Sequence, residues 1–244
     1  MRPIASPVVP AAEHSDGAVG DAGSWAGAFL LTWVSAAFAS TLVLVLLGGG
    51  ETATDTPIPV LAASLLAGWA VYVTGSVVAS RRLGTGDVRK DFGIAVRPID
   101  LFGLVVGAVG QVAVVPALYV PLRSIWPDTF DDEALRETAE SLVARADGAL
   151  LPVLFLMVVI GAPLFEELLY RGVLQRPLLD RLPAPAVIGG VAAVFAIIHF
   201  RPVEYPGLFV AGLIFGVCAW RTGRLGTAVL AHIGFNAVGL VSAL

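Results

Sequence analysis

Long apolar segments constrain this chain more than any other feature of its sequence. They reach about 20 residues and do not alternate strictly between apolar and polar side chains. Backbone N–H and C=O groups in lipid have no water to bind, so a spanning segment must be a helix or part of a closed barrel. Barrel strands are shorter and do alternate. The sequence therefore predicts an all-α, polytopic bundle of membrane helices.

The composition supports a membrane location. Of the 244 residues, 57% are hydrophobic and 14% are charged, whereas soluble domains carry about 25% charged residues. No basic stripe interleaved with aromatic residues indicates a nucleic-acid partner, so the lipid bilayer is the expected surrounding. The single cysteine, Cys218, excludes an internal disulfide and a thiolate metal cluster.

Seven membrane spans are predicted along the chain, with edges uncertain by a few residues. Residues 1–23 are small and polar, which predicts a disordered cytoplasmic tail rather than a cleaved signal peptide. We divide the remainder into an N-terminal three-helix region, 24–148, and a C-terminal core, 149–244. The predicted spans are roughly 25–47, 58–80, 99–121, 149–170, 185–200, 206–220 and 225–243.

The basic residues predict the orientation of the bundle. With seven spans, one side carries 11 Lys and Arg, in the tail and in loops 81–98, 171–184 and 221–224, and the other side carries 4. Cytoplasmic loops are enriched in Lys and Arg. The N-terminus is therefore expected in the cytoplasm and the C-terminus outside the cell membrane.

The longest predicted loop, 122–148, shows apolar residues at helical spacing opposite acidic residues. This pattern predicts a short amphipathic helix. Such a helix either lies on the outer membrane surface or is a solvated linker, and the sequence leaves both alternatives open. The apolar positions are Leu135, Ala139, Leu142, Val143 and Ala146.

Two adjacent acidic residues, Glu166 and Glu167, follow one of the most apolar runs of the chain. Ionisable residues at membrane depth are costly and usually functional. Glu167 lies four residues before Arg171, the favourable order for a helical ion pair, and Glu166 then points about 100° away. A carboxylate among apolar groups can act as a general base for water. The alternative is a helix end whose charges reach the headgroups.

Two further polar pairs lie on later apolar runs. Phe195 and His199, and likewise His232 and Asn236, are four residues apart, so each pair shares a helix face. An imidazole beside a carboxamide can stabilise an anionic tetrahedral oxygen. Taken alone, a polar residue in a membrane helix more often serves a hydrogen bond to a neighbouring helix.

Spacing along the chain links these residues. Glu166 and His199 are equidistant from the midpoint of a turn predicted at 179–185. An antiparallel hairpin there puts both at one depth, provided that the fourth helix continues well past the glutamates. His232 follows the RTGR turn by about ten residues, roughly 15 Å along a helix. We therefore expect Glu166, His199, His232 and Asn236 to converge in one cavity.

The ordered set of EExxxR, FxxxH and HxxxN on successive apolar segments resembles the CAAX protease and bacteriocin-processing (CPBP) family of intramembrane endopeptidases. The flanks EELLYRGVLQRPL and WRTGRLGTAVLAHIGFN are also similar to the family's usual surroundings. The similarity covers about residues 149–240. The first three spans resemble the family only as generic membrane helices.

The resemblance implies a role for each motif residue. The first glutamate and the FxxxH histidine would hold and activate the attacking water. The HxxxN pair would stabilise the oxyanion, and the second glutamate and the arginine would orient the site. The expected catalytic residues are Glu166, Glu167, Arg171, His199, His232 and Asn236.

The family has been described both as metal-dependent and as glutamate-type. Glu166, His199 and His232 could ligate zinc, which accepts nitrogen and oxygen ligands. We favour no tightly bound metal, because two of these three candidates already have roles without one. Neither HExxH nor GxSxG is present. The GTGD sequence at 84–87 lies in a polar loop and predicts a turn.

The predicted function is that of a hydrolase, an intramembrane endopeptidase that cleaves a membrane-associated or leader-type peptide or protein with a glutamate-activated water. One alternative is a non-catalytic immunity or scaffolding protein of the same fold. A less favoured alternative is an ion or proton transporter. Transporters often show broken helices or inverted repeats, and neither is apparent in this sequence. GLVVG and GLIFG, at 103–107 and 212–216, predict close helix packing.

Overall fold

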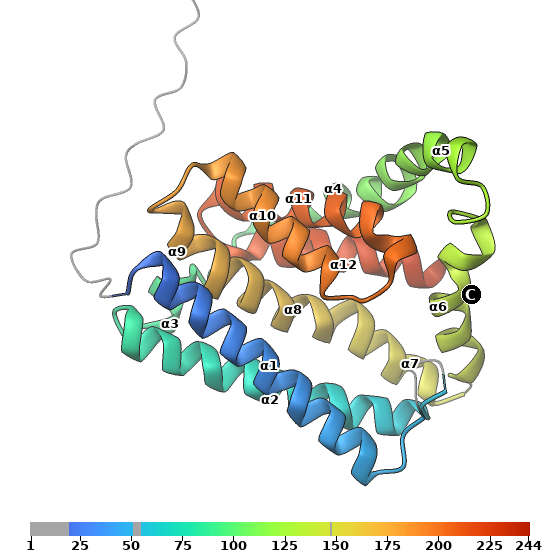
Figure 1. Ribbon diagram of the computed structural model, residues 1–244, viewed down its shortest axis with the longest axis horizontal. Helices are drawn as coiled ribbons and strands as arrows, with labels where there is room; N and C mark the ends of the chain where they lie inside the picture. Colours follow the sequence, from blue (N-terminus) through green and yellow to red (C-terminus); the bar gives the residue numbers. More distant parts are fainter. Residues whose placement is uncertain (1–19, 51–54, 147) are drawn as a thin grey trace, which may run out of the picture.

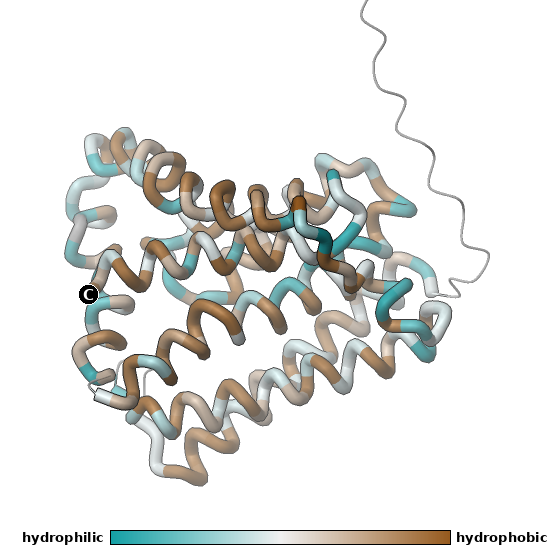
Figure 2. Tube along the Cα trace, turned by 180° about the vertical axis from the view of Figure 1, so that it is seen from behind, coloured by the Kyte–Doolittle hydropathy of each residue, from teal (hydrophilic) through white to brown (hydrophobic). Residues whose placement is uncertain are grey.

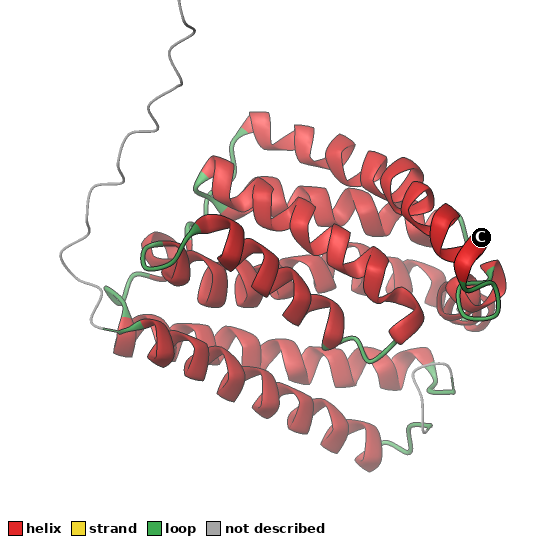
Figure 3. Ribbon diagram, turned by 45° about the horizontal axis from the view of Figure 1, so that its top comes forward, coloured by secondary structure: helices red, strands yellow, loops and turns green. Residues whose placement is uncertain are grey.

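The computed structural model describes residues 20–50, 55–146 and 148–244, and in this part of the chain helices are joined by loops and turns, without strands (Figure 3). Elements η1 and η5 are 3-10 helices, and η2, η3 and η4 are π-helical. In chain order the elements are α1 (Ala22–Leu46), α2 (Ile58–Leu83), α3 (Val88–Phe92), η1 (Pro98–Leu101), α4 (Phe102–Val109), η2 (Gly110–Val114), α5 (Val115–Ile125), α6 (Asp132–Arg145), α7 (Leu150–Phe155), η3 (Leu156–Gly161), α8 (Ala162–Glu167), η4 (Leu168–Gln175), α9 (Arg176–Leu179), α10 (Ala184–Ile197), η5 (Pro202–Glu204), α11 (Tyr205–Thr222) and α12 (Leu225–Val241).

The predicted membrane bundle is confirmed. Within the described residues, five helices are long and apolar enough to cross a membrane, and two shorter apolar helices accompany them. Hydrophobic residues predominate along these helices (Figure 2). Each of the seven overlaps one predicted span. They are Ala22–Leu46, Ile58–Leu83, Pro98–Ile125, Leu150–Leu179, Pro202–Thr222, Ala184–Ile197 and Leu225–Val241.

The helix from Leu150 to Leu179 is the centre of the bundle. The pair α1 and α2 packs on one side of it, and α10, α11 and α12 lie on the other (Figure 1). Its η4 segment contacts α1, α2, α10, α11 and α12. The main apolar core accordingly joins Trp25 and Phe29 of α1 to Leu169 of η4, Phe195 of α10 and Phe215 of α11. The acidic motif thus sits where both sides of the bundle meet.

One predicted connection differs from the structure. The loop predicted at 171–184 is wrong over its first part, because the helix continues to Leu179. Arg171 is therefore not a loop residue but is buried, with 1% of its surface exposed. The predicted tail, 1–23, falls mostly outside the described residues; α1 begins at Ala22, where the Asp21 side chain accepts a hydrogen bond from the Ser24 N–H. The turn predicted at 84–87 is confirmed, and Asp87 caps α3.

The predicted amphipathic helix is confirmed as α6. Its first turn is capped by the Asp131 carboxylate, which accepts a hydrogen bond from the Ala134 N–H at 2.6 Å. Leu142 and Val143 pack with Leu154 of α7 and Leu240 of α12. Neither a helix on the membrane surface nor a solvated linker predicts this contact. The apolar side of α6 packs against the ends of two other helices.

The predicted close packing at both glycine motifs is confirmed. A Cβ atom at Gly107 of α4 would overlap the Ala231 carbonyl oxygen of α12, and one at Gly234 of α12 would overlap the Leu104 carbonyl oxygen. At Gly212 of α11, a Cβ would lie 2.9 Å from the Cα of Ala192. These glycines let helix backbones touch, as is common between membrane helices.

Gly107→Ala is expected to destabilise the protein. The added methyl group must push α4 away from α12, and overpacking of this kind typically costs about 1–3 kcal/mol. Thermal unfolding in detergent measures the effect. Gly189→Ala is the matched control, because a Cβ there meets nothing within 4 Å and alanine favours helix. Equal melting temperatures for the two variants would contradict the close contact.

Candidate active site

The acidic motif ends α8, between two π-helical segments. Segment η3 precedes it and η4 follows it, within one continuous helix. π-helical turns widen a helix locally and occur frequently at functional sites. Convergence of Glu166 with His199 requires this helix to run past the glutamates, and it continues to Leu179 before the connection to α10.

The second glutamate, Glu167, is the centre of a buried ionic cluster. Its Oε1 accepts hydrogen bonds from Arg171 Nη1 at 2.8 Å and from His232 Nδ1 at 2.9 Å. Arg171 Nη2 donates to the Gly212 carbonyl of α11 at 3.1 Å. The side chains of Glu167 and Arg171 are completely buried. The predicted ion pair is confirmed, and it binds α8 and η4 to both α11 and α12.

The bond to Glu167 fixes the orientation of His232. A carboxylate accepts, so Nδ1 carries the proton and Nε2 remains as the second ring nitrogen. The imidazole also stacks on Phe215, with ring centroids 4.4 Å apart and planes at 18°. The histidine of HxxxN is thus held by one hydrogen bond and one aromatic face.

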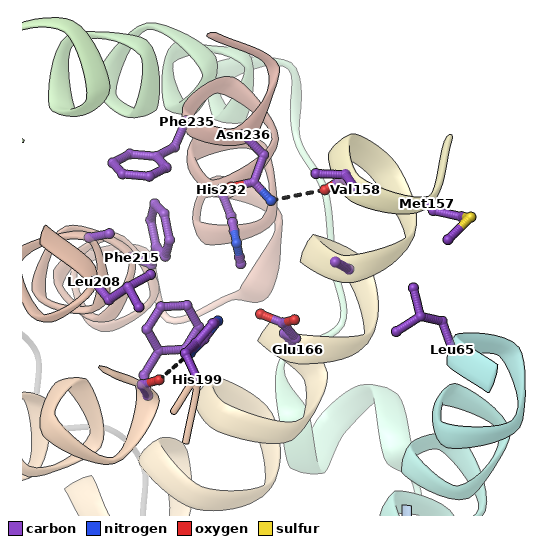
Figure 4. Close-up of a pocket in the computed structure, with 13 residues that line it drawn as sticks. Leu65, Met157, Val158, Glu166, His199, Leu208, Phe215, His232, Phe235 and Asn236 are labelled. Atoms are coloured by element: carbon purple, nitrogen blue, oxygen red, sulfur yellow. Dashed lines mark hydrogen bonds between the residues drawn. The ribbon is translucent and has the colours of Figure 1, made fainter. Parts of the chain in front are cut away.

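A cavity of about 260 Å³ lies beside this cluster. Its polar lining consists of Glu166, His199, His232 and Asn236, and most of its other walls are apolar. Figure 4 shows the Glu166 carboxylate pointing toward the side of the cavity that holds the imidazole rings of His199 and His232. The predicted convergence of these four residues in one cavity is therefore confirmed, while their catalytic roles stay predictions.

His199 follows the end of α10. Its Nδ1 pairs with the Phe195 carbonyl oxygen at 2.6 Å, and its ring meets the Phe195 ring at a centroid distance of 4.8 Å. The carbonyl can only accept, so Nδ1 is the donor and Nε2 is the acceptor nitrogen. The FxxxH spacing thus fixes the tautomer of the histidine as well as its direction.

Asn236 makes a contact that the sequence did not predict. Its Nδ2 donates to the Val158 carbonyl of η3 at 2.9 Å (Figure 4). A carboxamide nitrogen has two N–H donors, so one donor remains for a group in the cavity. No sequence signal joins the two residues, because 78 positions separate them.

The cavity does not bring together a set of metal ligands. Among the described residues, no three His, Cys, Asp or Glu side chains are grouped so that they could hold a metal ion. The candidate zinc ligands Glu166, His199 and His232 line the same cavity without forming such a group. The arrangement therefore does not fit a three-ligand zinc site, and we derive no step through a metal.

Two other buried polar contacts were missed by sequence reasoning. Gln175 Nε2 donates to the Gly216 carbonyl at 2.9 Å, one turn beyond the contact of Arg171 with α11. Asp100, fully buried, accepts from Arg224 Nε at 2.9 Å and Nη2 at 2.6 Å, just before α12 begins. The i,i+4 spacing could have predicted the Gln175 contact, because Gln175 lies four residues after Arg171 on the same helix face.

Comparison with known proteins points to the same part of the chain. Residues 148–238 match the family model described as Rce1-like, type II CAAX prenyl endopeptidase Rce1-like. This range includes the central helix, α10, α11 and most of α12, and with them all six expected catalytic residues. No curated protein and no solved structure matches the chain.

Proposed function

We propose that residues 148–238, which match the Rce1-like family model, form an active glutamate-type intramembrane endopeptidase. Its substrate would be a membrane-associated or leader-type peptide or protein. The observation that carries the proposal is the cavity where Glu166, His199, His232 and Asn236 meet. The family match supports a CAAX protease-type peptidase, and the cavity geometry supports the glutamate mechanism.

Glu166 is the proposed general base. Arg171 and His232 bind its neighbour Glu167, which leaves Glu166 as the carboxylate that faces the cavity. A water between Glu166 and His199 Nε2 can donate one hydrogen bond to each. As its oxygen attacks the scissile carbonyl carbon, one proton passes to Glu166 and then to the departing amine.

Asn236 and His232 are the proposed oxyanion donors. The free N–H of Asn236 can bind the developing alkoxide. His232 can donate through Nε2 only when both ring nitrogens are protonated, because Nδ1 already donates to Glu167.

Glu167 and Arg171 are proposed as positioning residues rather than reacting groups. Their buried pair holds His232 by its Nδ1 and holds α11 by the Gly212 carbonyl. Neither residue lines the cavity. Their effect on the reaction passes through the orientation of the histidine.

The proposed orientation follows the distribution of basic residues. With Arg171 counted as buried, the side that carries the N-terminus has 10 Lys and Arg, and the other side has 4. This bias still favours a cytoplasmic N-terminus and an external C-terminus in the cell membrane.

A cleavage assay tests the proposed function. The purified full chain in lipid vesicles is incubated with a library of leader-type and membrane-anchored peptides, and mass spectrometry identifies the products. Cleavage by the wild type and none by Glu166→Ala supports the proposal. A folded wild type that cleaves no peptide would favour the non-catalytic immunity or scaffolding alternative.

His232→Ala separates the glutamate mechanism from a zinc mechanism. Without metal, the variant loses one oxyanion donor and should retain slow turnover, reduced by about 10²–10³-fold. Chelators should not affect the wild type. Elemental analysis of purified, unsupplemented protein is the check. Stoichiometric zinc in the wild type that is lost in His232→Ala would establish the metal-dependent reading instead.

A further inference from the structure

The carbonyl that binds Asn236 is available because of the local helix geometry. In a π-helix the N–H of residue i+5 binds the carbonyl of residue i. At the end of η3 the Ala162 N–H binds the Met157 carbonyl in this way. The next bond in the series would join residue 163 to the Val158 carbonyl. Residue 163 is proline, which has no N–H.

The Val158 carbonyl therefore lacks both backbone N–H donors that a helix ordinarily supplies. Ala162, four residues ahead, is bound to Met157, and Pro163, five residues ahead, cannot donate. A carbonyl inside a membrane protein needs a partner, because no lipid group supplies one. Asn236 Nδ2 of α12 is that partner, at 2.9 Å.

We propose that Pro163 is a positioning residue for Asn236. By withholding an N–H, it leaves the Val158 carbonyl to bind one N–H of the Asn236 amide. The amide group is planar, so fixing one N–H fixes the direction of the other, which is then held toward the cavity. The inference rests on the proposed function, in which that second N–H stabilises the oxyanion.

Pro163→Ala tests the inference, because alanine restores the missing donor. The new N–H can bind the Val158 carbonyl and displace Asn236. A proline inside a helix is ordinarily destabilising, so a purely structural view predicts an unchanged or more stable protein with unchanged activity. The positioning role predicts that activity falls although stability does not.

An activity-independent measurement is available because Asn236 is the single asparagine of the 244-residue chain. Selective ¹⁵N-asparagine labelling therefore gives one side-chain NH₂ signal pair in an NMR spectrum. We expect that pair to shift, and its exchange with solvent to accelerate, in Pro163→Ala. An unchanged NH₂ pair would overturn the inference whatever the enzyme does.

The kinetic measurement uses a peptide that the wild type cleaves. Pro163→Ala should lower kcat by about 10–10²-fold with little change in KM, since misplacing a catalytic group by about 1 Å can cost 10²-fold. In the Asn236→Ala background the same substitution should cause no further loss. Pro152→Ala, an exposed proline of the same helix, is the matched control and should leave kcat unchanged.

The outcomes separate the inference from the proposed function. An additive loss in the double variant, or an equal loss in Pro152→Ala, would overturn the positioning role of Pro163. If Asn236→Ala keeps full activity, the oxyanion assignment of the proposed function fails. If the wild type cleaves nothing, the proposed function fails, and the NMR signal alone decides whether Pro163 sets the Asn236 amide.

Discussion

Glu166→Gln is expected to abolish measurable hydrolysis while the fold stays intact. The glutamine side chain is nearly the same size as glutamate, but its amide cannot take the proton from water. Removing a general base costs about 10²–10⁴-fold in rate, and here the same carboxylate also holds the water. Single-turnover cleavage and thermal unfolding, measured on the same preparation, check both parts of the expectation.

The matched control for this substitution is Glu140→Gln. Glu140 lies exposed on α6, outside the cavity, and its neutralisation should leave the rate unchanged. Turnover retained in Glu166→Gln would contradict the base assignment. In that case either Glu167 acts as the base or the activity belongs to another protein in the preparation.

Arg171→Ala is expected to lower stability and activity together. The substitution leaves the fully buried Glu167 carboxylate without its cation, and breaking a buried pair in this way costs about 3–5 kcal/mol. The variant also removes the hydrogen bond to the Gly212 carbonyl, which helps to hold α11 against the central helix. Denaturant or thermal unfolding in detergent measures the loss of stability.

A double variant distinguishes a stranded charge from a general packing defect. Replacing a buried pair by neutral groups of similar size is often close to neutral for stability. Glu167→Gln combined with Arg171→Met should therefore be more stable than Arg171→Ala alone, although His232 loses its carboxylate and activity stays low. An unchanged melting temperature in Arg171→Ala would show that solvent reaches the pair.

Local rules predicted much of this fold and site from the sequence. The apolar runs predicted seven helices, and the i,i+4 spacing predicted the contact of Glu167 with Arg171. The span end predicted from hydropathy is wrong at Arg171, because an arginine in an apolar run was taken as the start of a loop. Its charge is instead compensated inside the bundle by Glu167, so the helix continues to Leu179.

The remaining features depend on contacts between segments that are distant in the chain. The bond from His232 to Glu167 spans 65 residues, and the bond from Asn236 to Val158 spans 78. Their formation depends on how α12 docks against the central helix and on its π-helical turns, which no local periodicity indicates. The domain division at residue 149 and the roles of the six expected catalytic residues stay predictions.

The contact of α4 with α12 also sets the order in which the cavity can form during synthesis. Chains are made from the N-terminus, so α4 enters the membrane well before α12. α12 supplies His232 and Asn236, and the backbones of these two helices touch at Gly107 and Gly234. A nascent chain that has not yet docked α12 on α4 lacks half of the cavity's polar lining. Biogenesis itself would thus delay any proteolysis until the bundle is assembled.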